Sequence, residues 1–143
     1  DILAAMGIEQ LKRIDHIVTE KELIARKYSS EFTNDPFISP PFLPEYVDQH
    51  SWYMYPISLR EDIDRDYMVE KLKEEGIDTR LSFPPVHLQP YYQERFGYID
   101  NSYPVSLKAW QQLIDLPIWV GLSEEDQNYV IDTLREIVDK VES

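Results

Sequence analysis

A proline-rich turn carries the residues best suited to chemistry in this sequence. Residues 79–92 read Thr-Arg-Leu-Ser-Phe-Pro-Pro-Val-His-Leu-Gln-Pro-Tyr-Tyr, and they run from the end of a predicted strand into a double-proline turn. Polar donors on a rigid loop at the end of a strand are typical of binding sites. Arg80 can pair a carboxylate or a phosphate through two parallel hydrogen bonds. The alternative is that Arg80 and His87 are ordinary surface or capping residues.

Other chemical signatures are absent from the sequence. The three histidines, His16, His50 and His87, include no pair at the i, i+4 spacing of a zinc helix. The chain has no cysteine, which excludes disulfides, thiolate catalysis and cysteine-bound zinc. It also has no glycine-rich phosphate loop and no serine nucleophile elbow. We therefore predict no catalytic residue and no metal site in this chain.

The charge balance limits the possible partners. The chain has 14 basic and 27 acidic residues, a formal net charge of −13. Such a charge repels phosphate backbones and anionic lipids, so we expect neither nucleic acid nor a membrane as partner. No apolar run approaches the ~20 residues that span a bilayer, and no secretory signal is visible, so a cytoplasmic location fits. The chain starts at Asp1 already in helical register, which indicates a piece cut from a longer protein.

The first half predicts one long helix, a connector and a strand. Apolar residues repeat at three- and four-residue steps over residues 1–32, with Gly7 inside the pattern as either a tolerated glycine or a site of close backbone approach. Residues 35–48 contain four prolines and read as an extended connector without ladder donors. Residues 51–59 are rich in β-formers, and Pro56 demotes this strand to an edge or bulged position.

The second half alternates helices and strands. Asp64 can cap a helix over 65–75 that Gly76 ends, and Ser123 can cap the last helix. The other predicted elements are strands at 77–83 and 114–116 and helices at 90–96 and 104–112. A small sheet covered by helices and preceded by a long helix makes an α/β fold of the α+β sandwich type, with its own core.

Four blocks of the sequence resemble the motifs of one enzyme family. The segment Asp-Ile-Leu-Ala-Ala-Met-Gly-Ile-Glu-Gln-Leu resembles the family's helix of the form D-x-x-A-A-x-G-x-x-Q-L. His-Ser-Trp-Tyr-Met-Tyr-Pro-Ile resembles its aromatic strand. Gly-Ile-Asp-Thr-Arg followed by Pro-Val-His-Leu-Gln-Pro-Tyr resembles its C-terminal signature. Leu-Pro and Leu-Ser-Glu-Glu-Asp resemble its closing pattern, and the four blocks occur in the family's order and spacing. On these blocks the chain resembles the DegT/DnrJ/EryC1/StrS family of sugar aminotransferases.

The resemblance implies a fold type I enzyme that uses pyridoxal phosphate. Residues 1–34 would be a connecting helix and residues 35–143 the C-terminal small domain, with the large cofactor-binding domain absent. The parent would be a homodimer that aminates a nucleotide-linked keto-sugar with nitrogen from glutamate. Within the family, the signature looks most like the perosamine-synthase branch, at Thr79, Arg80, Phe83, Pro85 and His87.

The resemblance also suggests roles for three residues. Arg80 and His87 would make polar contacts on the sugar side of the pocket, where His87 would donate to a sugar hydroxyl or cap the turn. Ser82 stands where many relatives place a histidine that faces the sugar, which leaves the particular sugar open. We take Arg80, Ser82 and His87 as the candidate substrate-binding residues.

None of the seven lysines matches the family's Schiff-base context S-F-x-x-x-K. We therefore expect the chain alone to be inactive and to hold pyridoxal phosphate only loosely. Two alternatives stay open, a non-catalytic α/β interaction module and a sugar dehydratase of the same family. Without a large domain, the face of the first helix that carries Leu3, Met6 and Gly7 would be uncovered, and we expect the chain to associate through it.

Overall fold

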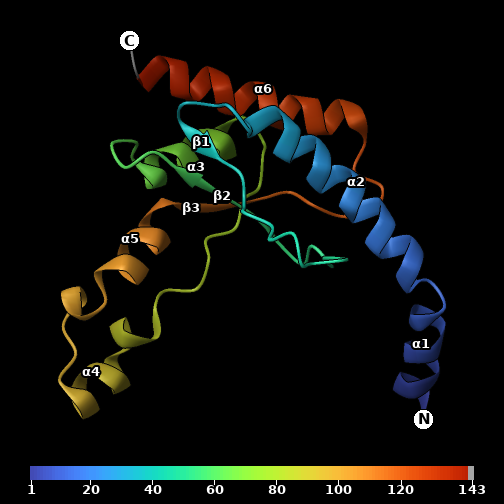
Figure 1. Cartoon of the computed structure of the whole chain (residues 1–143), viewed down its shortest axis with the longest axis horizontal. Helices are drawn as coiled ribbons and strands as arrows, with labels where there is room; N and C mark the ends of the chain where they lie inside the picture. The colour runs from blue at the N-terminus through green and yellow to red at the C-terminus, as the bar shows by residue number, and fades with distance from the viewer. Residues whose placement is uncertain (142–143) are drawn as a thin grey trace.

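The computed structural model describes residues 1–141 of the chain (Figure 1). In chain order the helices and strands are α1 (Ile2–Leu11), α2 (Ile14–Phe32), β1 (Ile38–Ser39), β2 (Tyr55–Leu59), α3 (Arg65–Glu74), the 3₁₀ helix η1 (Val86–Leu88), α4 (Pro90–Phe96), the 3₁₀ helix η2 (Asp100–Ser102), α5 (Pro104–Gln112), β3 (Leu113–Leu116) and α6 (Glu124–Val141). The helices among these residues are too short or too polar to cross a membrane.

The predicted N-terminal helix is interrupted and forms α1 and α2. The interruption lies at Lys12 and Arg13, where the Arg13 amide bonds the Gln10 carbonyl at 3.0 Å, three residues back, before α2 begins. Gly7 lies within α1, and a Cβ there would meet nothing within 4 Å, so the described part of the chain makes no close backbone approach at Gly7. No residue of α1 is buried, whereas α2 turns one face into the core.

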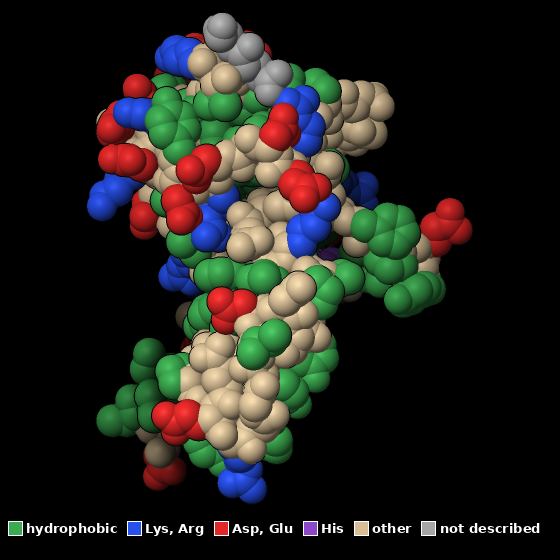
Figure 2. Space-filling model, turned by 90° about the vertical axis from the view of Figure 1, so that its left-hand side faces the viewer, with side chains coloured by type: hydrophobic (Ala, Val, Ile, Leu, Met, Phe, Trp, Pro, Cys, Tyr) green, Lys and Arg blue, Asp and Glu red, His purple; other side chains and the backbone are tan. Residues whose placement is uncertain are grey.

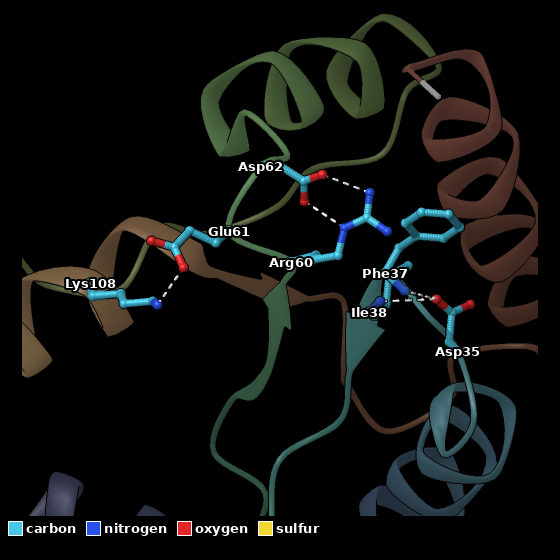
Figure 3. Close-up of polar contacts among 7 residues, drawn as sticks. All are labelled: Asp35, Phe37, Ile38, Arg60, Glu61, Asp62 and Lys108. Carbon is cyan, nitrogen blue, oxygen red and sulfur yellow. Dashed lines mark hydrogen bonds and ion pairs between the residues drawn. The ribbon is translucent and has the colours of Figure 1, made fainter. Parts of the chain in front are cut away.

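The sheet has three antiparallel strands in the order β1-β2-β3. The prediction that residues 35–48 supply no strand was wrong, because Ile38 and Ser39 pair with Leu59 and Ser58. Figure 3 shows how this turn is held: Asp35 Oδ1 accepts the amides of Phe37 and Ile38, each at 2.9 Å.

The ends of β1 and β2 are also linked by side chains. The Arg60 guanidinium lies 4.4 Å from the centre of the Phe37 ring and donates to both carboxylate oxygens of Asp62, at 2.5 and 2.7 Å (Figure 3). Nearby, Lys108 of α5 pairs with Glu61. Strand β1 pairs with β2 at Ser58 and Leu59. At Pro56, β2 therefore has only β3 beside it, and such a local edge of the sheet tolerates proline.

The segment 77–83 forms no strand, which corrects the prediction. Only Arg80 pairs with β3, through two bonds with Asp115. The backbone groups on either side of this bridge are used elsewhere. The Ile77 amide bonds the Leu72 carbonyl at 2.9 Å as α3 ends, and the Ser82 carbonyl accepts from the Trp110 indole at 2.9 Å. Ile77 and Ser82 therefore use these backbone groups outside the sheet, and the segment does not extend the ladder beyond Arg80.

Helices α2, α3 and α6 pack with the sheet around one core. Figure 1 shows α2 and α6 lying together over the strands. The predicted caps are confirmed: Asp64 Oδ1 accepts the Asp66 and Tyr67 amides, and Ser123 Oγ accepts the Asp126 amide at 3.0 Å. The largest fully buried side chains come from all of these elements and include Tyr28, Phe32, Tyr55, Ile57, Met68, Leu72, Ile114, Ile131, Leu134 and Val138.

A separate lobe projects from this core. It comprises η1, α4, η2 and α5, residues 86–112, and neither α4 nor α5 has a buried residue. Figure 2 shows the lobe below the main body, with fewer charged side chains on the visible face. The lobe holds together through ring contacts at centroid distances of 5.1–6.0 Å among His87, Tyr91, Tyr92, Phe96, Tyr98 and Tyr103.

Candidate functional site

A cleft of about 300 Å³ opens at the edge of the sheet where β2 begins and β3 ends. Three stretches of chain form it: the residues that precede β2, the extended segment after α3, and the end of β3 with the residues beyond it. Its lining consists of Tyr53, Met54, Asp78, Arg80, Asp115, Leu116, Pro117, Ile118 and Trp119. Of the three predicted site residues, Arg80 lines this cleft.

Arg80 is fixed by its backbone and free at its side chain. Its amide donates to the Asp115 carbonyl at 3.2 Å, and its carbonyl accepts from the Asp115 amide at 2.9 Å. Within residues 1–141 its exposed guanidinium makes no hydrogen bond or ion pair, although most of the other arginines make one. In a chain with 27 acidic residues, an unpaired guanidinium at a cleft is available to an anionic ligand.

Asp115 is a buried carboxylic acid beside Arg80. Asp115 is 4% exposed, and Ser82 Oγ lies 3.4 Å from each of the two carboxylate oxygens of Asp115. Burial raises the pKa of Asp115, while the Ser82 hydroxyl and the charge of Arg80 oppose that rise. Sequence reasoning missed this residue, although an acid between Ile114 and Leu116 in an apolar strand was a signal.

The raised pKa of Asp115 predicts a pH-dependent effect of Asp115→Asn. Because its folded-state pKa lies above its unfolded value, the stability that protonated Asp115 contributes is present at low pH and lost as pH rises through the folded pKa. Asparagine cannot ionise. The stability of the variant relative to the wild type should therefore increase between about pH 4 and pH 7, as measured by urea unfolding of both proteins. A pH-independent difference would contradict this cause.

Ser82 is not among the residues that line the cleft, but it helps to anchor the Arg80 segment. Its carbonyl accepts from the Trp110 indole, and its hydroxyl faces Asp115. Trp110 is in turn held by Arg65, which is 8% exposed, stacks on the indole at 5.3 Å and donates to the Trp110 carbonyl at 3.1 Å. These contacts join α3, α5 and the extended segment and so position Arg80.

His87 lies in the lobe. It is 5% exposed, its Nε2 lies 3.1 Å from the Asp100 carbonyl, and its ring packs on Tyr103 at 5.1 Å. The imidazole thus links η1 to η2. The structure brings Arg80 and Ser82 close to Asp115 and places His87 among the aromatic rings of the lobe.

The seven lysines of this chain lie on its surface. Lys12, Lys27, Lys71 and Lys108 pair with carboxylates, and Lys21 donates to the Trp52 carbonyl at 2.9 Å. None of the seven is buried or lines the cleft, and all fall within the described part of the chain. A Schiff-base lysine must be desolvated enough for its amine to be neutral. Residues 1–141 also contain no cluster of acidic and histidine side chains suited to a metal ion.

The sequence and the fold point to one family. Residues 1–135 match the DegT/DnrJ/EryC1/StrS aminotransferase family. The chain belongs to this family. Among curated proteins, it is 34% identical over 142 residues to the spore coat polysaccharide biosynthesis protein SpsC of Bacillus subtilis, a match that covers 96% of this chain and 36% of SpsC. The chain therefore spans about a third of the length of such relatives.

Solved structures of the family share this fold. The pyridoxal phosphate form of the putative sugar aminotransferase Spr1654 from Streptococcus pneumoniae superposes with a TM-score of 0.87 at 26% identity, covering 99% of this chain and 36% of that one. DesV of S. venezuelae, in complex with a ketimine intermediate, superposes with a TM-score of 0.84 at 29% identity, covering 93% and 35%. The prediction of an α+β fold with a small sheet is confirmed.

Proposed function

We propose that this chain is the C-terminal small-domain part of a pyridoxal-phosphate-dependent aminotransferase that acts on a nucleotide-linked keto-sugar, with glutamate as amino donor. The match to the family over residues 1–135 and the coverage of about a third of its relatives support this assignment. The observation that carries it is the cleft at the sheet edge, where the unpaired guanidinium of Arg80 faces open space. The cofactor would supply the electron sink for the amino transfer.

In this proposal residues 1–34 connect the small domain to the large one. The apolar side chains of α1 are exposed, with Ile2 at 80% and Leu3 at 82%. A large domain packed on that helix would remove these side chains from water. The working enzyme would be a cytoplasmic homodimer, and the cleft would form the sugar side of its active site. Arg80 would bind an anionic group of the substrate, with Ser82 and His87 as further candidate residues.

A product assay on the aminotransferase that contains this chain tests the proposed function. The enzyme is incubated with pyridoxal phosphate, glutamate and a nucleotide-linked 4-keto-6-deoxyhexose. We expect an amino sugar nucleotide and an equal amount of 2-oxoglutarate, both measured by mass spectrometry. A deoxygenated sugar that carries no amino group, formed together with equal amounts of 2-oxoglutarate and ammonia, would show a dehydratase instead, and the absence of any sugar product would favour a non-catalytic module.

The 143-residue chain alone should form no specific Schiff base with pyridoxal phosphate. Its lysines are solvated or paired with carboxylates, and the partner Glu74 raises the pKa of Lys71, so a neutral amine is scarce. We expect no Schiff-base absorbance that survives dilution, and borohydride reduction should label the lysines weakly and without preference. The longer aminotransferase is the positive control. Stoichiometric labelling of one lysine in the isolated chain would contradict the expectation.

A further inference from the structure

Trp119 differs from the other two tryptophans in having no internal contact for its polar group. The indole of Trp52 donates to Glu22, and that of Trp110 donates to the Ser82 carbonyl. Within residues 1–141 the Trp119 indole has no hydrogen-bond partner and stacks on no other ring, and the residue is 50% exposed. A large aromatic surface left bare beside a cleft is suited to a planar ligand.

Tyr53 is also exposed and lines the same cleft. It is 73% exposed, and its hydroxyl has no hydrogen-bond partner in the described part of the chain. Tyr53, Trp119 and Arg80 therefore line one cleft from three different stretches of sequence. Two free aromatic rings and one free guanidinium match a ligand that contains a flat ring and an anionic group.

A second cleft lies on the other side of Trp119. It has a volume of about 410 Å³ and shares Asp78, Pro117 and Trp119 with the first, so these residues form the wall between the two clefts. Its further lining is mostly apolar and includes Ile77, Leu122 and Val130. Asp78 lines both clefts, but the second cleft adds Asp126 and has no basic lining residue, whereas the first cleft has Arg80 to attract a phosphate. An anionic group is therefore favoured on the Arg80 side, and a neutral ring fits the wall.

We propose that Trp119, with Tyr53, is the stacking platform for the nucleobase of the nucleotide-sugar substrate, and that Arg80 pairs with its diphosphate. This inference rests on the proposed function and assigns the nucleotide part of the substrate to the cleft lined by Tyr53, Arg80 and Trp119. Any of the bases can stack on an aromatic side chain, because every base has a π face. A guanidinium binds phosphate oxygens through two parallel hydrogen bonds. The platform thus recognises a nucleoside diphosphate and leaves the identity of the base to other contacts.

The test compares Trp119 variants of the aminotransferase that contains this chain. Trp119→Ala should weaken inhibition by a free nucleoside diphosphate, and raise KM for the nucleotide sugar, by roughly 5- to 150-fold. Trp119→Phe keeps an aromatic face and should retain most of the affinity. Tyr46→Ala removes an aromatic side chain that is 86% exposed and lies outside both clefts, and it should leave the inhibition constant unchanged.

The two half-reactions separate the possible anions at Arg80. Arg80→Ala should weaken binding of the nucleoside diphosphate and leave binding of the nucleoside without phosphate unchanged. The reaction of the enzyme with glutamate alone, followed by the cofactor's absorbance, should keep its KM in the Trp119 and Arg80 variants. A raised KM for glutamate with unchanged nucleotide binding would assign Arg80 to the donor's carboxylate and overturn the inference.

The failure of this inference is distinguishable from that of the proposed function. If the wild-type enzyme transfers the amino group but Trp119→Ala binds the nucleoside diphosphate as the wild type does, the platform is wrong and the aminotransferase assignment stands. If the wild type transfers no amino group, the proposed function fails first. Circular dichroism of each variant shows whether its fold is retained, and Trp119→Phe supplies the comparison should the alanine variant unfold.

Discussion

Arg80→Ala should lower kcat/KM for the keto-sugar by roughly 10- to 150-fold in the aminotransferase that contains this chain. A hydrogen bond to a charged group contributes about 1.5–3 kcal/mol, and the Arg80 side chain has no internal partner that it would release on binding. The bonds that fix the segment come from its backbone, at 3.2 and 2.9 Å to Asp115. The fold should therefore tolerate the change, with the free energy of unfolding altered by no more than about 0.5 kcal/mol.

Steady-state kinetics with the nucleotide sugar as varied substrate measure this effect. Arg80→Lys keeps the charge but loses the planar pair of donors, so it should recover only part of the activity. Arg95→Ala is the matched control, because Arg95 lies in α4 and donates to the Tyr91 hydroxyl, in the lobe. A change of less than threefold in Arg80→Ala would exclude Arg80 from substrate binding.

Phe32→Ala should destabilise the 143-residue chain by about 3–5 kcal/mol, the usual result of removing a buried phenyl ring. Phe32 is 0% exposed at the end of α2, its ring lies parallel to that of Tyr28 at 6.3 Å, and Arg135 of α6 lies 5.9 Å above it. The substitution leaves a cavity between α2 and α6. Because such domains are stable by only about 5–15 kcal/mol, a large share of the total would be lost.

Urea unfolding followed by circular dichroism measures this loss of stability. Phe42→Ala is the control, since Phe42 is 87% exposed and its removal should change the free energy of unfolding by about 0.5 kcal/mol or less. Equal effects of the two substitutions would mean that α2 does not belong to the core.

Local signals in the sequence located most of the helices. Asp64 and Ser123 mark the starts of α3 and α6, because a capping side chain bonds amides only two or three residues away. Gly76 and Gly97 have φ values of 78° and 70° at the ends of α3 and α4, a conformation that glycine adopts without strain. Pro90 and Pro104 begin α4 and α5 for an equally local reason.

The sheet was harder to predict because its pairing joins distant residues. The prolines around Ile38 favour an irregular connector, yet Ile38 pairs with Leu59, which lies 21 positions away and supplies the ladder. The opposite error occurred at residues 77–83, whose composition suits a strand. There, bonds to the end of α3 and to Trp110 compete with the ladder and leave Arg80 as the single bridge.

By itself, the sequence determined the family and the positions of most helices, and it singled out Arg80 as a candidate residue, because residue order and short-range spacing carry that information. The tertiary structure alone decided which side chains meet. It set Asp115 beside Arg80 and brought Tyr53 and Trp119 to the same cleft, while it buried His87 in the lobe. Residues 53, 80 and 119 lie far apart in the chain, and the pairing of β2 with β3 and the bridge between Arg80 and Asp115 bring them together, so no local pattern could show that they line one cleft.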